Sequence, residues 1–168
     1  MRLGLRKRSN LAATTLIETT VATAICAIFL GSIFAVNTGS MQTVKMAREA
    51  ASASQILQQR VESLRIANWH QITDATWLKN NLLNTSAPGS SALRSVSEQL
   101  MLVPYGSTTA GNIQLTRSNG STSIVSSQAL LAENAVKVIW TVTYTGSPNN
   151  RSMSRQLVAI LAKGGVAK

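Results

Sequence analysis

The sequence predicts an α+β protein in which one long N-terminal helix packs on a C-terminal antiparallel sheet of about four strands. Three observations support this class. Residues 11–37 form an apolar run, residues 42–64 continue it with strong helix formers, and from residue 99 onward apolar and polar residues alternate as strands require. Of the 168 residues, about 130 lie beyond the N-terminal run, enough for one small domain.

The N-terminal run has three ordinary explanations. A secretory signal peptide would also begin with a basic segment such as MRLGLRKR, but its apolar stretch is about 7 to 15 residues, shorter than 16–36. A plain membrane anchor fits in length, and the basic leader orients it with its N-terminus in the cytoplasm. A buried core helix leaves unexplained why basic residues stand immediately before it. The anchor is therefore the strongest of the three.

Glu18 is the sole charged residue between Arg8 and Lys45. An acidic side chain inside hydrocarbon costs on the order of 3 kcal/mol, so it indicates a functional site with a cationic partner. No Lys or Arg follows it within the next two helical turns, and the leader arginines lie at least ten residues upstream. A new α-amino group, created by cleavage just before the run, would supply the missing charge.

The residues before Glu18 resemble a known processing site. The segment consists of Ala13, Thr14, Thr15, Leu16, Ile17 and Glu18. It is similar to the junction of type IV pilins and type II secretion pseudopilins, in which a short basic leader ends in Gly and Phe-Thr-Leu-Ile-Glu follows. The four residues from Thr15 match, whereas Ala13 and Thr14 stand where that family usually has Gly and Phe. The resemblance covers the first quarter of the chain.

The resemblance implies that a prepilin peptidase cuts after Ala13 and that the new N-terminal residue, Thr14, is N-methylated. Residues 1–13 would be the leader, 14–39 the half of the helix that spans the membrane and later forms the filament core, and 40–168 a periplasmic or extracellular domain that includes the amphipathic half of the helix. The implied location is the bacterial inner membrane and then the pilus or pseudopilus. The implied partners are other pilin subunits, the peptidase, the inner-membrane assembly platform and the membrane.

The amphipathic half of the helix is expected to run to Arg65. Apolar or small side chains recur every three or four residues and predict a packing face made of positions 44, 47, 51, 54, 57, 61 and 64. Four polar residues are expected to fall largely elsewhere around the helix: Gln58, Gln59, Arg60 and Glu62. Flexibility of the helix, if present, should centre on Gly31, Ser32 and Gly39.

Beyond the helix, residues 69–79 are expected to form a mixed connection and 84–95 a surface loop. Strand patterns occur at 99–103, 112–117, 122–126, 135–145 and 153–162. Asn119-Gly120 predicts a tight hairpin between the second and third of these segments. In the fourth, alternate residues predict one shared face: Val136, Val138, Trp140, Val142 and Tyr144.

Composition favours a protein without catalytic activity, cofactor or metal. His70 is the single histidine, Cys26 the single cysteine, and one Asp and four Glu follow Glu18, so no catalytic or metal-binding constellation can be assembled. The net charge is +10, but four basic residues lie in the leader; without it, twelve basic residues face six acidic ones, a net +6. The twelve contain no run of three, which predicts generic basic surface rather than a nucleic-acid stripe.

Two function classes remain. The favoured one is a structural, minor subunit of a type IV pilus or pseudopilus, in which Glu18 neutralises the α-amino group of a neighbouring subunit within a low-dielectric filament core. The alternative is a single-pass, membrane-anchored binding module whose basic outer domain captures DNA or another anionic partner. Leader removal and the role of Glu18 distinguish the two.

Overall fold

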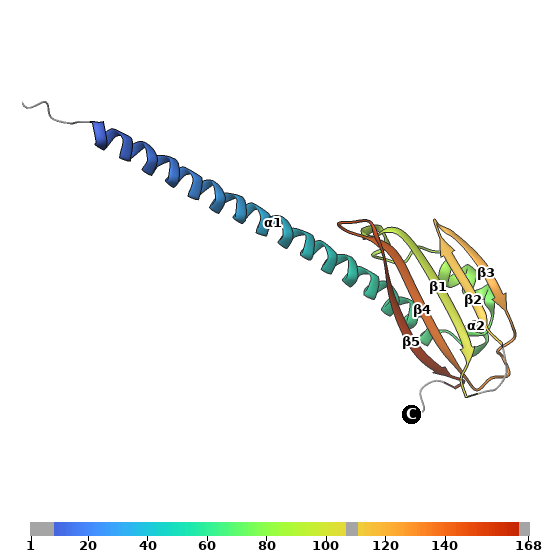
Figure 1. The fold of residues 1–168 in the computed structure, drawn as a ribbon. Helices are drawn as coiled ribbons and strands as arrows, with labels where there is room; N and C mark the ends of the chain where they lie inside the picture. Colours follow the sequence, from blue (N-terminus) through green and yellow to red (C-terminus); the bar gives the residue numbers. More distant parts are fainter. Residues whose placement is uncertain (1–8, 107–110, 165–168) are drawn as a thin grey trace, which may run out of the picture. The chain divides into compact units, whose positions relative to one another are not determined.

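The computed structural model describes the backbone of residues 9–106 and 111–164, with side chains described from residue 15 onward. The chain divides into two units, Met1–Thr43 and Val44–Lys168. The helix α1 (Ser9–Ile66) forms the described part of the first unit and is also the first element of the second (Figure 1). The helix continues without a break through Gly31, Ser32 and Gly39.

Five antiparallel strands form the sheet of the second unit. They are β1 (Arg94–Pro104), β2 (Ile113–Ser118), β3 (Ser121–Ser127), β4 (Ala135–Gly146) and β5 (Arg151–Ala162). Their order is β3-β2-β1-β4-β5, which puts β1 in the centre and β3 and β5 at the edges. The predicted α+β class is confirmed. The sheet has five strands rather than about four because every segment with a strand pattern joins it.

Local sequence explains the hairpin between β2 and β3. Asn119 and Gly120 both have positive φ angles, 51° and 80°, as the two central residues of a type I′ turn require. The turn is closed by the pairing of Ser118 with Ser121. The predicted hairpin is therefore confirmed.

The central strand β1 is longer than the sequence predicts. It begins at Arg94, inside the expected loop 84–95, and pairs with β2 on one side and β4 on the other. The register with β4 shifts between Arg94 and Ser97, where Ser95 has a φ of 50°, the sign of a bulge. Pairing with β4 begins at Arg94 and pairing with β2 at Ser97, so these polar residues form a strand despite their weak apolar pattern.

The expected mixed connection 69–79 is largely helical. It contains α2 (Trp69–Ile72) and α3 (Ala75–Trp77) and continues into the π-helix η1 (Leu78–Leu83); a short 3-10 helix, η2 (Ser90–Ala92), follows. Asp74 starts α3 by accepting a hydrogen bond from the backbone N–H of Thr76 at 2.8 Å. Buried leucines of η1 then hold this segment in the core.

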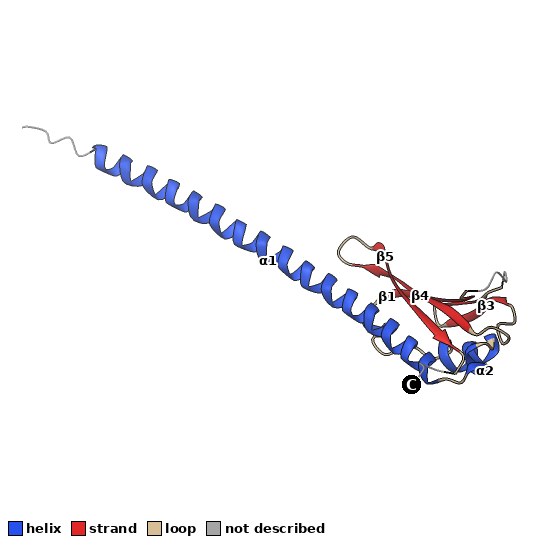
Figure 2. Ribbon diagram, turned by 90° about the horizontal axis from the view of Figure 1, so that it is seen from below, coloured by secondary structure: helices blue, strands red, loops and turns tan. Residues whose placement is uncertain are grey.

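The core of the second unit lies between one face of the sheet and its helices, which gather on that face (Figure 2). The five residues predicted to share a face of β4 are all buried: Val136, Val138, Trp140, Val142 and Tyr144. Trp140 is the largest fully buried side chain, and Leu100 of β1 and Leu157 of β5 stand directly opposite it. Period-two alternation placed these side chains correctly.

The packing face of α1 differs from the predicted one. Positions 57, 61 and 64 are buried as expected, position 54 is half-buried, and positions 44, 47 and 51 are exposed. The buried face instead includes Glu49, Ala53, Ile56 and Arg60. The expectation that Arg60 lies away from the core is therefore wrong. Its guanidinium finds partners on the sheet and the π-helix, which a count of apolar residues along α1 does not reveal.

Candidate functional site: the exposed apolar helix and its glutamate

The first unit exposes a long apolar surface. Each residue from 15 to 43 is exposed, and the large apolar side chains range from 48% exposed at Ile33 to 75% at Ile28. The most apolar part of α1 has a mean hydropathy of 2.1, and none of it is buried within the chain. By length and composition, α1 is a candidate membrane span near the N-terminus.

Hydroxyl groups in this segment are satisfied by the backbone of their own helix. Thr19 donates to the carbonyl of Thr15 at 2.9 Å and Thr23 to that of Thr19 at 2.9 Å. The same pattern recurs at Thr20, Ser32, Thr38 and Ser40. Such local bonds let small polar residues enter an apolar medium without unpaired groups. These side chains are therefore compatible with a lipid or protein environment.

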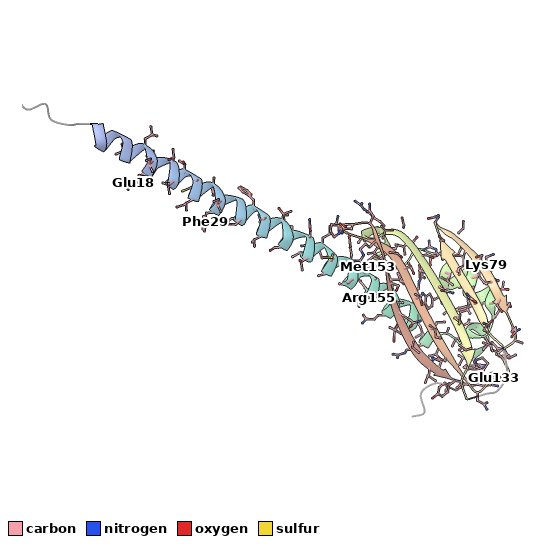
Figure 3. All side chains as sticks on the ribbon, viewed as in Figure 1. Glu18, Phe29, Lys79, Glu133, Met153 and Arg155 are labelled. Atoms are coloured by element: carbon pink, nitrogen blue, oxygen red, sulfur yellow. The ribbon has the colours of Figure 1, made fainter. Side chains whose placement is uncertain are left out.

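Glu18 is different, because its carboxylate has no hydrogen bond or ion pair in the part of the chain that the structure describes. The side chain projects from the exposed helix (Figure 3). An ionised carboxylate on an apolar helix needs a partner from outside the helix, since α1 has no cation among its described residues between Glu18 and Lys45. The described residues of one chain therefore leave this site incomplete.

The other residues of the sequence motif flank Glu18. Thr15, Leu16 and Ile17 occupy the helical turn before it, and Leu16 and Ile17 are both well exposed. The backbone of Ala13 and Thr14 is helical, while their side chains lie outside the described residues. The structure therefore places the matched positions on one continuous helix with Glu18.

A second polar site, not anticipated from the sequence, lies in the core of the domain. Glu98 on β1 accepts hydrogen bonds from Arg60 Nε at 2.9 Å, Arg60 Nη2 at 3.0 Å and Arg117 Nη1 at 3.3 Å. Arg60 also donates to the carbonyls of Leu82 and Thr85. The Glu98 side chain is 1% exposed and that of Arg60 6%. This buried network joins α1, the central strands and the end of the π-helix.

Aromatic packing completes the network. The Arg60 guanidinium lies 5.9 Å from the centroid of the Trp140 ring, within cation–π range. Arg117 Nη2 donates to the Ser86 hydroxyl at 2.8 Å, whereas Arg117 Nε and Trp140 Nε1 are buried without a partner among the described residues. Two guanidinium groups thus share one carboxylate. Breaking this arrangement would leave uncompensated buried charge, so we assign it a structural role.

The sequence did contain a signal for part of this network. Glu98 is two residues from Leu100 on β1, and Arg117 is two residues from Leu115 on β2, so both charged residues share the buried face of the sheet. Because Glu98 and Arg117 are directly paired across the strands, their opposite charges meet. Extending the strand alternation to polar residues would have found this pair.

Glu49 forms a third polar contact, between α1 and the β4–β5 turn. Its Oε2 atom accepts a hydrogen bond from the backbone N–H of Ser147 at 3.0 Å. This hydrogen bond, supported by the positive charges of Lys45 and Arg94, lowers the pKa of Glu49 below its ordinary value. The contact links residues 98 positions apart in the sequence.

Titratable groups elsewhere do not gather. Within the described ranges, no group of three or more His, Cys, Asp or Glu side chains is placed to hold a metal ion. His70 and Cys26 are both exposed. Comparisons with models of protein families, with curated proteins and with solved structures find no match for this chain.

Proposed function

We propose that this chain is a minor structural subunit of a type IV pilus or of a type II secretion pseudopilus. It is inserted in the bacterial inner membrane through the first part of α1 and loses residues 1–13 to a prepilin peptidase. It is then assembled with other pilin subunits, by an inner-membrane platform, into a filament built on its N-terminal helix. The globular domain that follows is displayed outside the cytoplasm.

The observation that carries this proposal is the isolation of Glu18. Its carboxylate lacks a partner among the described residues, on a helix whose apolar side chains are exposed and whose hydroxyls are satisfied internally. A plain anchor has no use for such a group, since it raises the cost of insertion. An assembly helix does, because the α-amino group of Thr14 on a neighbouring subunit can neutralise it and set the register of packing.

Charge along the chain supports the orientation. Four basic residues precede the span within the first eight positions, whereas Lys45 and Arg48 are the two basic residues that follow it most closely. The larger positive charge is retained in the cytoplasm during insertion. The domain therefore emerges on the far side, where a filament subunit must be presented.

Processing provides the first test. Membrane-extracted protein should begin at Thr14 and carry one methyl group on its α-amino nitrogen, which N-terminal sequencing and intact mass determine. A strain without prepilin peptidase should retain Met1 in the membrane pool. A mature protein that keeps residues 1–13, or one cut after the span, would contradict the proposal.

Assembly provides the second test. Glu18→Gln should leave the domain folded and the leader cleaved but reduce incorporation into filaments. Leaving one member of a buried ion pair uncompensated costs about 3 to 5 kcal/mol, which lowers the incorporation equilibrium by roughly two to four orders of magnitude. The measurement compares the protein in sheared filaments with that in membranes, in a strain that lacks the native copy.

Glu62→Gln is the matched control, because it removes an exposed carboxylate from the same helix. It should assemble like the wild type, and Glu18→Asp should be intermediate because it keeps the charge on a shorter side chain. If Glu18→Leu enters filaments as well as the wild type does, the pairing account is wrong. Glu18 would then have to be explained by recognition at the peptidase or by snorkelling of its carboxylate to the membrane interface.

A further inference from the structure

A cluster of exposed cations lies at one end of the second unit. Its members are Lys45 and Arg48 on the first turns of α1 in this unit, Arg94 at the start of β1, and Arg151 at the start of β5. Pairing across the sheet brings the strand residues together, since Arg94 stands opposite Thr145 and Arg151 opposite Gly146. These four residues are called the basic cluster below.

Glu49 attaches the helical members of the cluster to the strand members. Its hydrogen bond to the Ser147 N–H holds the β4–β5 turn against α1, and its Oε2 atom lies 3.7 Å from the Cβ position of a side chain built at Gly146. Lys45 is one helical turn before Glu49 and therefore on the same side of α1. The fold thus brings the helical and strand members of the cluster to one end of the domain, where the positive charges of Lys45 and Arg94 both help to lower the pKa of Glu49.

The helical members of the cluster, Lys45 and Arg48, follow the candidate span closely in the sequence. The apolar run 16–36 is about 31 Å long as a helix, close to the ~30 Å of a bilayer core. Lys45 follows Val36 by nine residues, or about 13 Å, and the polar headgroup layer occupies roughly 5 to 7 Å of that distance. The distance that remains between the backbone of Lys45 and the headgroup layer is within the reach of a Lys or Arg side chain. It is also below the Debye length of about 8 to 10 Å.

From this placement we propose that the basic cluster binds anionic phospholipid headgroups and docks the domain on the membrane surface before assembly. The inference rests on the membrane anchoring in the proposed function. The cluster is positively charged, as binding to anionic headgroups requires. Its side chains are exposed and form no ion pair among the described residues, whereas Arg60 and Arg117 are buried and paired with Glu98. The occupant is a lipid surface rather than a nucleic acid because only nine residues separate Lys45, the first member of the cluster, from Val36 at the end of the apolar run.

The other end of the same domain supplies a matched set of cations. Lys137 pairs with Ile160 near the start of β4, and the backbone N–H of Lys163 donates to the carbonyl of Asn134 at 2.7 Å. Arg65 lines a groove with Lys163 at this end. Figure 3 shows Met153 and Glu133 toward opposite ends of the sheet, the first on the side of the cluster and the second on the side of the control set.

The experiment uses the full chain in lipid nanodiscs. A fluorescent donor is attached at Asn149→Cys in the exposed β4–β5 turn, on a Cys26→Ser background, and energy transfer to headgroup-labelled lipid reports docking. Transfer should be higher with phosphatidylglycerol present than in pure phosphatidylcholine, where the anchored domain stays undocked, and the difference should fall as salt rises to about 0.5 M. In the variant Lys45→Gln/Arg48→Gln/Arg151→Gln, the ratio of docked to free domain should fall about 100-fold, since each cation near an anionic surface contributes about fivefold.

The control variant Arg65→Gln/Lys137→Gln/Lys163→Gln removes the same charge and should dock like the wild type. An equal loss in both variants would overturn the proposal, because net charge alone would then explain docking. The proposal would also be overturned if energy transfer in the wild type does not depend on phosphatidylglycerol. If short duplex DNA binds through the basic cluster under those conditions, the cluster is a nucleic-acid site instead. Failure of the chain to enter nanodiscs would refute the anchoring itself, which separates that failure from the failure of lipid docking alone.

Discussion

Replacement of Glu98 by Gln should destabilise the domain far more than its small change in shape suggests. Glu98 accepts three hydrogen bonds from two arginines, at distances from 2.9 to 3.3 Å, with a side chain that is 1% exposed. Glutamine keeps one acceptor oxygen but points an amide NH₂ group toward guanidinium donors. Two buried cations would then face no negative charge.

The size of the effect follows from burial. Breaking a buried ion pair by removing one partner costs about 3 to 5 kcal/mol, against a typical domain stability of about 5 to 15 kcal/mol. Arg60 retains the Leu82 and Thr85 carbonyls, and Arg117 retains the Ser86 hydroxyl, so the network loses its charge balance rather than every hydrogen bond. We expect a loss within that range of 3 to 5 kcal/mol rather than complete unfolding.

Urea titration of the full chain in a mild non-ionic detergent measures this loss through tryptophan fluorescence. The three tryptophans, Trp69, Trp77 and Trp140, all belong to the second unit and report its unfolding. Glu62→Gln is the control, because its partner Arg65 lies 3.4 Å away and both side chains are more than half exposed. An exposed pair of this kind contributes between about 0 and 1 kcal/mol.

A loss of less than about 1 kcal/mol for Glu98→Gln, equal to that of the control, would refute the reasoning. It would mean that the core accommodates two unneutralised guanidinium groups, through water or through rearrangement of η1. The structural role assigned to the network would then have to be withdrawn.

Two further substitutions test other contacts of the fold. The pKa of Glu49 is lowered from 4.5, mainly by the hydrogen bond from the Ser147 N–H. The ionised carboxylate therefore contributes stability above pH 4.5, and this contribution is lost as the pH falls through the folded pKa. The urea midpoint of Glu49→Gln should accordingly depend less on pH below about 4.5 than that of the wild type. Gly120 has a φ of 80° with no atom within 4 Å of a built Cβ, so Gly120→Ala should cost about 1 kcal/mol through backbone strain alone. Thermal melts of the variants measure this cost. Gly120→Asn should cost less, because Asn tolerates this conformation, and an Ala variant as stable as glycine would contradict the argument.

Patterns that repeat over a few residues were sufficient to predict much of the molecule. The apolar run and the helical spacing that follows it located α1, and the Asn119-Gly120 pair located the hairpin, because each depends on the residues' own preferences. Alternation in β4 predicted that Trp140 is buried, since successive side chains of a strand must point to opposite faces. The candidate assembly site around Glu18 also came from local sequence, and the structure adds that the segment around it is exposed.

Tertiary structure alone decided which polar residues of α1 are buried. Arg60 looks like a surface residue of an amphipathic helix, yet it meets Glu98, 38 positions away, and carbonyls at the end of η1. Glu49 likewise finds its partner 98 positions away, in the turn between β4 and β5. A charged side chain is stable in a core only when a partner satisfies it, and such partners come from elements brought together by the pairing order of the sheet. Periodicity along a single helix carries no information about that order, so the rotated packing face of α1 followed from the assembled domain.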